Sequence, residues 1–133
     1  MVNLGIDNKT CVDAKIYDNR VTGFLKVAEC HGQGDNQYIE LTIDGELRVE
    51  DFCMDYDGKK SNAKMIHCHH MKGNQYWKYE FLTKLLIHVE TEKCLTIEVK
   101  HHQLIVENCD QENLYQMWKF QFFDPEKLFR SKN

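Results

Sequence analysis

The chain has 133 residues, of which 42% are hydrophobic and 29% are charged, and its formal net charge is −4. This composition predicts one folded domain, because enough apolar surface is present to offset the entropy cost of ordering the chain. Lysine and arginine are spread along the sequence, which argues against nucleic-acid or heparin binding, and no run approaches the ~20 apolar residues of a membrane span. The first residues show neither a charged leader nor an apolar run, so we expect no signal peptide there.

Short runs of residues that favour β-strands recur along the chain, and turn sequences such as Asp44-Gly45 and Asp57-Gly58 separate them. In chain order, strands are expected over Tyr38–Ile43, Glu46–Val49, Met65–Cys68, Tyr76–Phe81, Leu85–Val89, Cys94–Val99, Leu104–Val106 and Trp118–Phe122. Asp110–Gln116 is the one segment where a helical period could extend beyond about one turn. The sequence therefore predicts an all-β domain.

Six cysteines in so short a chain predict a disulfide framework and an oxidising compartment. Their spacing groups them into three close pairs, from which we predict the disulfides Cys11–Cys30, Cys53–Cys68 and Cys94–Cys109. Closing loops of ~15–20 residues would stabilise the fold by roughly 3 kcal/mol each. Asn8-Lys9-Thr10 is a sequon, which makes Asn8 a candidate N-glycosylation site in a secretory protein. Since such a protein needs a signal sequence, we expect this chain to be a domain excised from a longer precursor.

The cysteine pairs mark a threefold repeat of ~40 residues. The first, second and third units carry the three pairs in order and extend over about residues 8–48, 49–89 and 90–123. Each second cysteine is followed by a Gln-x-apolar element, namely Gln37-Tyr38-Ile39, Gln75-Tyr76-Trp77 and Gln116-Met117-Trp118. We expect the Trp or Ile to fill a shared core and the Gln amide to bind backbone groups that would otherwise be unsatisfied. Three such units predict a β-trefoil with four strands per unit, as a single domain over residues 1–133.

Polar residues recur at fixed places beside this scaffold in the first two units. They are an Asp two positions after the first cysteine, a His directly after the second and an Asn directly before the Gln: Asp13, His31 and Asn36, then Asp55, His69 and Asn74. A carboxylate and a carboxamide held together can accept from two adjacent sugar hydroxyls and donate back to one of them. The alternative is that the Asp residues cap turns and the Asn residues fill turn positions. The third unit has Thr96, Asp110 and Tyr115 at the matching places, which predicts a scaffold role.

The combination of C-x-D, then C-H, then N-Q with Q-x-W, resembles the ricin B-type lectin fold. More narrowly, Glu29–Gln37 and Cys68–Trp77 are similar to the C-terminal lectin domain of the polypeptide N-acetylgalactosaminyltransferases, and the similarity extends from about Cys11 to Phe120. The resemblance implies that the six recurring Asp, His and Asn residues bind sugar. It also implies that the domain binds GalNAc on a glycopeptide and directs a linked catalytic domain to further sites of mucin-type O-glycosylation, in the Golgi lumen.

The manganese site of those transferases belongs to a catalytic domain that has no counterpart in this sequence. We therefore expect this chain to be no enzyme and to need no cofactor or metal, whereas its parent would be a GalNAc-transferase that requires Mn²⁺. The expected partners are GalNAc or a GalNAc-glycopeptide and the catalytic domain of the same polypeptide. Contacts with nucleic acid or a membrane are not expected.

This sequence also departs from the family in ways that keep alternatives open. The family often has an aromatic ring two residues before the second cysteine, where this chain has Ala28 and Ile66, so stacking against the sugar should be weaker. Family habit slightly favours the first unit as the active one. The alternatives are a stand-alone ricin-type galactose/GalNAc lectin, and a trefoil that has lost sugar binding and serves in protein interaction. A metal site around His67-Cys68-His69-His70 is disfavoured, because a strand places His67 and His69 on the opposite face from Cys68, and Cys53 pairs with that thiol.

Overall fold

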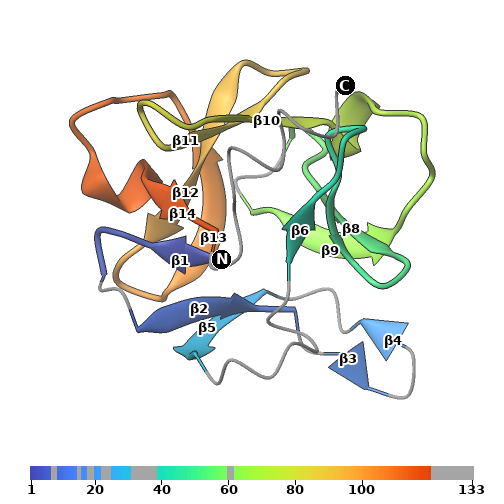
Figure 1. The fold of residues 1–133 in the computed structure, drawn as a ribbon, viewed down its shortest axis with the longest axis horizontal. Helices are drawn as coiled ribbons and strands as arrows, with labels where there is room; N and C mark the ends of the chain where they lie inside the picture. Colours follow the sequence, from blue (N-terminus) through green and yellow to red (C-terminus); the bar gives the residue numbers. More distant parts are fainter. Residues whose placement is uncertain are drawn as a thin grey trace, which may run out of the picture.

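A computed structural model describes residues 1–6, 9–14, 16–17, 20–21, 25–30, 39–59 and 62–120 of the chain. Within these residues the fold is all-β, with three four-stranded antiparallel sheets and one two-stranded hairpin (Figure 1). This arrangement confirms the predicted fold class, a β-trefoil stabilised by three disulfides.

Each four-stranded sheet pairs strands in a fixed order. The first sheet contains β14 (Trp118–Lys119), β1 (Val2–Asn3), β2 (Thr10–Asp13) and β5 (Lys26–Glu29). The second contains β6 (Glu40–Leu41), β7 (Leu47–Val49), β8 (Phe52–Asp55) and β9 (Lys64–His67). The third contains β10 (Trp77–Glu80), β11 (Leu85–His88), β12 (Lys93–Glu98) and β13 (Gln103–Glu107). The hairpin is β3 (Ile16–Tyr17) with β4 (Arg20–Val21), and two short 3₁₀ helices, η2 (Gly73–Gln75) and η3 (Leu114–Gln116), precede the strands of the two tryptophans.

Every sheet joins two units of the sequence repeat. In the second sheet, β6 and β7 follow the first cysteine pair, whereas β8 contains Cys53 and β9 ends at the residue before Cys68. The residue opposite the first cysteine of a pair is Val2, Arg48 or Ile87 in the three sheets, and this shared register shows that the units are structural repeats. The second and third units also touch directly, because the Ala63 N–H donates to the carbonyl oxygen of Leu104 over 2.9 Å.

The core confirms the structural role predicted for the Q-x-W element. Trp77 and Trp118 are fully buried, and each indole N–H donates over 2.9 Å to a backbone carbonyl oxygen, that of Met54 and that of Leu95. Ile39 occupies the corresponding place in the first unit and is also buried. A buried indole thus contributes apolar area without leaving its one donor unsatisfied.

The glutamines of the element hold the loop that follows each second cysteine. The Gln75 amide donates to the carbonyl oxygen of His67 over 3.0 Å and accepts from the backbone N–H of His69 over 3.1 Å. Gln116 makes the matching pair of bonds in the third unit, 2.8 and 2.7 Å long. Both glutamines are buried, so these bonds satisfy backbone groups that the sheets leave unpaired, as the sequence predicted.

All three predicted disulfides are present, and their Cα atoms lie 5.0 Å apart in each case. The sequence did not predict strands β1 to β5 or strand β8. The four residues of β8 are all buried, so this strand lacks the alternation of polar and apolar residues that marks a half-buried strand. The expected helical turn at Asp110–Gln116 is reduced to the single turn η3.

Candidate carbohydrate-binding site

In the second unit, Asp55 and Asn74 lie next to each other through the backbone. Asp55 is the last residue of β8 and is 7% exposed, and the N–H of the following Tyr56 donates to the carbonyl oxygen of Asn74 over 3.1 Å. The Asn74 side chain is exposed on η2. Within the described part of the chain, no residue forms a hydrogen bond to the carboxylate of Asp55 or to the side-chain amide of Asn74. Both groups therefore keep their capacity to bind a ligand.

His69, the third predicted residue of this unit, is fixed by the neighbouring scaffold. Its backbone N–H donates to the amide oxygen of Gln75, the residue after Asn74. Its ring Nδ1 accepts from the N–H of Met71 over 3.0 Å, which leaves the proton on Nε2. Since the ring is exposed, His69 offers an N–H donor to a ligand.

The three side chains of the second unit are thus carried by one hydrogen-bonded network. Tyr56 links Asp55 to Asn74, and Gln75 links Asn74 to His69. The network places a carboxylate acceptor, an amide with both donor and acceptor atoms, and an imidazole donor on a rigid scaffold. Two adjacent sugar hydroxyls need such a mixed set, because each hydroxyl both donates and accepts.

The apolar contact expected beside the sugar is limited. Ile66 lies on β9 opposite Cys53 and is 41% exposed, so it offers an aliphatic surface where the family often has an aromatic ring. The ring of Tyr76, two residues after Asn74 in the sequence, is partly buried, and the Lys72 ammonium lies over one face, 4.7 Å from the ring centroid. This cation–π contact covers a face of the ring and was not predicted from the sequence.

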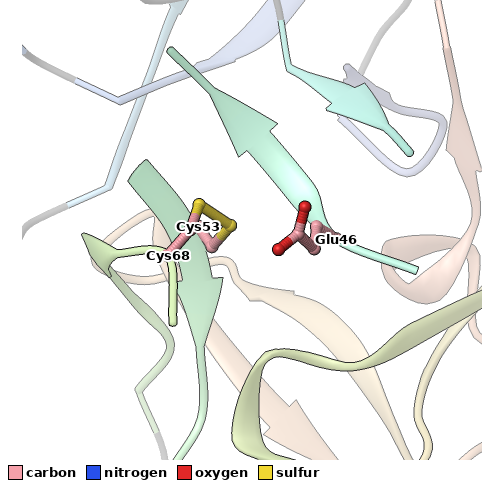
Figure 2. Close-up of side chains that lie close together, drawn as sticks. All are labelled: Glu46, Cys53 and Cys68. Carbon is pink, nitrogen blue, oxygen red and sulfur yellow. A yellow bond between two sulfur atoms is a disulfide. The ribbon is translucent and has the colours of Figure 1, made fainter. Parts of the chain in front are cut away.

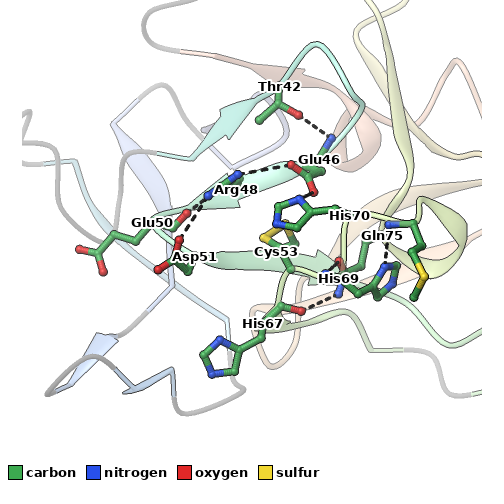
Figure 3. Close-up of polar contacts among 12 residues, drawn as sticks. Thr42, Glu46, Arg48, Glu50, Asp51, Cys53, His67, His69, His70 and Gln75 are labelled. Atoms are coloured by element: carbon green, nitrogen blue, oxygen red, sulfur yellow. Dashed lines mark hydrogen bonds and ion pairs between the residues drawn. A yellow bond between two sulfur atoms is a disulfide. The ribbon is translucent and has the colours of Figure 1, made fainter.

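Figure 3 shows a second polar cluster, which sequence reasoning missed, around His70, the residue that follows His69. The carboxylate of Glu46 is almost fully buried and binds Nδ1 of His70 over 2.9 Å and the guanidinium of Arg48 over 3.7 Å. Arg48 also contacts Asp51 over 3.3 Å. His70 has a left-handed backbone with φ of 61°, which is unusual for a residue other than glycine, and the bond to Glu46 helps to hold it there. No local pattern predicts a contact between residues so far apart in the chain.

The side chains of Glu46, Cys53 and Cys68 come close enough together to suggest a metal site, with potential ligand atoms within 4.8 Å of one another. Figure 2 shows, however, that the two sulfur atoms are joined in a disulfide beside the carboxylate. Disulfide sulfur is no longer a thiolate, so this group lacks the ligands that a zinc ion would need. The carboxylate is already engaged by His70 and Arg48.

The first unit is described only in part. Asp13 ends β2 and pairs with Lys26 of β5, as Asp55 ends β8 and pairs with Lys64 of β9. His31, Asn36 and the sequon residue Asn8 lie outside the described residues. The structure therefore brings together the candidate residues of the second unit, and of the first unit it places Asp13.

The third unit keeps the scaffold but not the polar set. The Thr96 hydroxyl is buried and donates to the carbonyl oxygen of Cys94 over 3.1 Å, so it faces inward. Asp110 stands where the second unit has His69, and its carboxylate accepts from the N–H of Glu112 over 3.0 Å. Tyr115 replaces Asn74. The three residues therefore differ in chemical type from the Asp, His and Asn of the second unit, and the side chains of Thr96 and Asp110 already form hydrogen bonds within the chain.

No helix among the residues that the structure describes has the length and apolar character required to span a membrane.

Comparison with solved structures gives two informative neighbours. A crystal structure of GalNAc-T7 with UDP, GalNAc and Mn²⁺ matches with a TM-score of 0.73 and 25% identity, covering 88% of this chain and 21% of that chain. A non-toxic homologue of type II RIPs from Momordica charantia, in complex with α-methyl-D-galactoside, matches with a TM-score of 0.69 and 17% identity, covering 84% of this chain and 44% of that chain. The second likeness shows the fold.

Sequence comparison points to the same family. The putative polypeptide N-acetylgalactosaminyltransferase 9 of Drosophila melanogaster is 38% identical over 126 residues, which cover 95% of this chain and 19% of that protein. The polypeptide N-acetylgalactosaminyltransferase 5 of Caenorhabditis elegans is 35% identical over 125 residues, 94% of this chain and 20% of that protein. The chain thus spans about a fifth of the length of these curated relatives, and the resemblance to their lectin domain is confirmed. Residues 2–118 match the model of the ricin-type beta-trefoil lectin domain, and the chain belongs to this family.

Proposed function

We propose that this lectin domain binds GalNAc already attached to an O-glycosylated peptide, through Asp55, His69 and Asn74 of the second unit. The observation that carries the proposal is the hydrogen-bond network, through the Tyr56 N–H and the Gln75 side-chain amide, that joins these three residues. Within the described chain it leaves the Asp55 carboxylate, the Asn74 amide and Nε2 of His69 without hydrogen bonds. The Asp55 carboxylate accepts from two neighbouring sugar hydroxyls, the Asn74 amide donates to one of them, and His69 supplies a further N–H donor. An axial hydroxyl gives galactose-type rings a different geometry from glucose at such a site.

The domain's role follows from linkage to a catalytic domain in the same polypeptide, as in the GalNAc-transferases to which it is similar. A shallow site with a few hydrogen bonds, each worth ~0.5–1.5 kcal/mol, binds a free monosaccharide in roughly the millimolar range. Tethering raises the effective concentration of the acceptor peptide near the catalytic domain, so a weak site is sufficient. The parent protein is thus a polypeptide GalNAc-transferase of the Golgi lumen, and this domain directs it to substrates that already carry GalNAc.

The test is a residue-resolved NMR titration of the 133-residue chain with a Thr peptide that carries GalNAc. The unglycosylated peptide and glucose serve as ligand controls. Asp55→Asn removes one charge at nearly constant size, and Asp13→Asn makes the same change at the end of β2. We expect shifts around Asp55 and Asn74 in the wild type, loss of these shifts in Asp55→Asn and their retention in Asp13→Asn.

Other outcomes would each correct a defined part of the proposal. If Asp13→Asn abolishes binding and Asp55→Asn does not, the site lies in the first unit. An equal response to glucose contradicts recognition of GalNAc. If no residue shifts at ligand concentrations of about 10 mM or more, the trefoil has lost sugar binding and serves in protein interaction.

A further inference from the structure

His88 is a fully buried side chain that lies directly behind the second-unit site. It ends β11 opposite Trp77 and has 0% exposure. Its Nε2 lies 2.9 Å from the carbonyl oxygen of Asn74, and its Nδ1 lies 2.9 Å from the hydroxyl of Thr91. The rings of Tyr56 and Trp77 meet its ring edge-on, with centroids 5.2 and 4.8 Å away. The imidazole is therefore fixed in both position and orientation.

The hydrogen bonds define the state of the ring. A carbonyl oxygen only accepts, so Nε2 carries a proton and donates to Asn74, and in the neutral ring Nδ1 accepts from the Thr91 hydroxyl. Burial away from water lowers the pKa of His88 below its ordinary value, against the opposing effects of the Asn74 bond and of the charges on Asp55 and Glu90. The neutral form with the proton on Nε2 thus fits both partners.

The carbonyl oxygen of Asn74 receives two donors, the Nε2–H of His88 and the backbone N–H of Tyr56. These bonds come from β11 and from the residue that follows Asp55, so they fix the Asn74 backbone from two separate strands. The side-chain amide of Asn74 itself is left exposed. Its position relative to the Asp55 carboxylate consequently depends on how firmly this one carbonyl is held.

The same structural position is filled differently in the other two sheets. Asn3 lies opposite Trp118 as His88 lies opposite Trp77, and its amide donates over 2.7 Å to the carbonyl oxygen of Tyr115, the counterpart of Asn74. In the second sheet the position belongs to Val49, since Arg48 pairs with Cys53 as Ile87 pairs with Cys94. A valine side chain has no donor. The first and second units both have a candidate Asn before the Gln. At this position the third sheet supplies His88, which donates to Asn74 of the second unit, whereas the second sheet supplies Val49, which cannot donate.

We propose that His88 is a positioning residue of the carbohydrate site in the second unit: by donating to the Asn74 carbonyl, it holds the Asn74 amide beside the Asp55 carboxylate. This inference rests on the proposed function, because it assigns to His88 a part in that site. Val49, at the same position in the second sheet, has no donor with which to play this part.

Three variants test the proposal. His88→Leu removes both ring bonds, whereas in His88→Gln the side-chain NH₂ can still donate to Asn74 and the amide oxygen can accept from Thr91. The matched control is Asn3→Leu, which removes the equivalent bond to Tyr115 in the third unit. Each variant is titrated with the GalNAc-bearing Thr peptide, its melting temperature is measured, and the ¹⁵N relaxation of the Asn74 backbone and side-chain amides is recorded.

We expect His88→Leu to weaken glycopeptide binding by about 3- to 10-fold, the factor typical of one lost hydrogen bond, and to increase the mobility of the Asn74 amides. His88→Gln should recover most of the affinity, and Asn3→Leu should lose stability while binding as the wild type does. Unchanged binding in folded His88→Leu, or an equal loss in Asn3→Leu, overturns the positioning role. If His88→Leu does not fold, Thr91→Val, which removes only the hydroxyl that orients the ring, takes its place with the same expectations at smaller amplitude.

The two proposals fail in different ways. If the wild type does not bind the glycopeptide, the proposed function is wrong and His88 is no part of a sugar site. In that case, relaxation of Asn74 in His88→Leu still decides whether the ring holds this residue. If the wild type binds and loses binding in Asp55→Asn, but His88→Leu binds normally, the function stands and the positioning role is refuted.

Discussion

Replacing Gln75 with leucine tests the idea that one side-chain amide supports both the fold and the site. Leucine has a similar volume, so the change leaves little cavity and removes the donor to His67 and the acceptor for the His69 N–H. The two backbone groups are partly buried, and each one left unpaired costs about 1–3 kcal/mol. Two such groups would cost about 2–6 kcal/mol when fully buried. Because these two are only partly buried, we expect a loss of about 2–4 kcal/mol in the free energy of unfolding. At about 3–5 °C per kcal/mol for a domain of this size, the melting temperature should fall by roughly 6–20 °C.

The assay is thermal and urea unfolding followed by circular dichroism under non-reducing conditions, together with glycopeptide titration. Gln116→Leu is the matched control, because Gln116 makes the same two bonds in the third unit. Both variants should lose similar stability, but only Gln75→Leu should weaken binding, since Gln75 holds His69. If Gln75→Leu unfolds within about 0.5 kcal/mol of the wild type, the amide bonds do not support the fold as argued.

Three further changes address other parts of the structure. Replacing both cysteines of the Cys53–Cys68 disulfide with alanine should lower the free energy of unfolding by about 3 kcal/mol, because the bridge closes a loop with a sequence separation of 15. Urea unfolding measures this change, and an unchanged midpoint would contradict it. The pKa of His88 is lower in the folded than in the unfolded state, so its stabilising contribution is complete above pH ~6.5 and is lost as the pH falls through the pKa of the folded state. Melting temperatures measured between pH 7.5 and 4.5 should show this loss. An equally steep loss in His88→Gln would refute the assignment to His88. Gly45→Ala should destabilise by about 2–4 kcal/mol, because φ is 85° and the new methyl group would collide with the ring of Tyr76. Gly58→Ala, with φ of 79° and only an ordinary van der Waals contact with the Thr91 side chain, should cost about 1 kcal/mol in the same denaturation assay.

The repeat made the scaffold predictable from the sequence. Cysteine pairs and Gln-x-apolar elements recur about every 40 residues, and such residues have few ways to be satisfied when buried. The three disulfides, the core role of Trp or Ile and the backbone-binding role of Gln could therefore be predicted, although the individual partners of Trp and Gln could not. The same argument located Asp55, His69 and Asn74 as candidates, and the structure shows that hydrogen bonds of their neighbours Tyr56 and Gln75 connect them.

Other features depend on contacts that no local pattern encodes. Strand β8 is buried on both faces, so it shows no alternation. The bond between Glu46 and His70 connects residues of two different loops, so the spacing of residues along the sequence does not reveal it. His88, Asn3 and Val49 share one structural position but are chemically unlike, so aligning the repeats by residue type does not find them.

The sharing of every sheet between two neighbouring units fixes the number of units in the domain. A single unit cut from the chain would carry two half-sheets, each with an unpaired edge and an exposed apolar face, and would have no reason to fold alone. A solenoid can gain or lose a repeat at its ends, because each repeat contacts only its neighbours in a row. Here β1 pairs with β14 and closes the row into a ring, as Figure 1 shows. We therefore expect unfolding to be all-or-none, and a deletion of one unit to remove the fold rather than to shorten it.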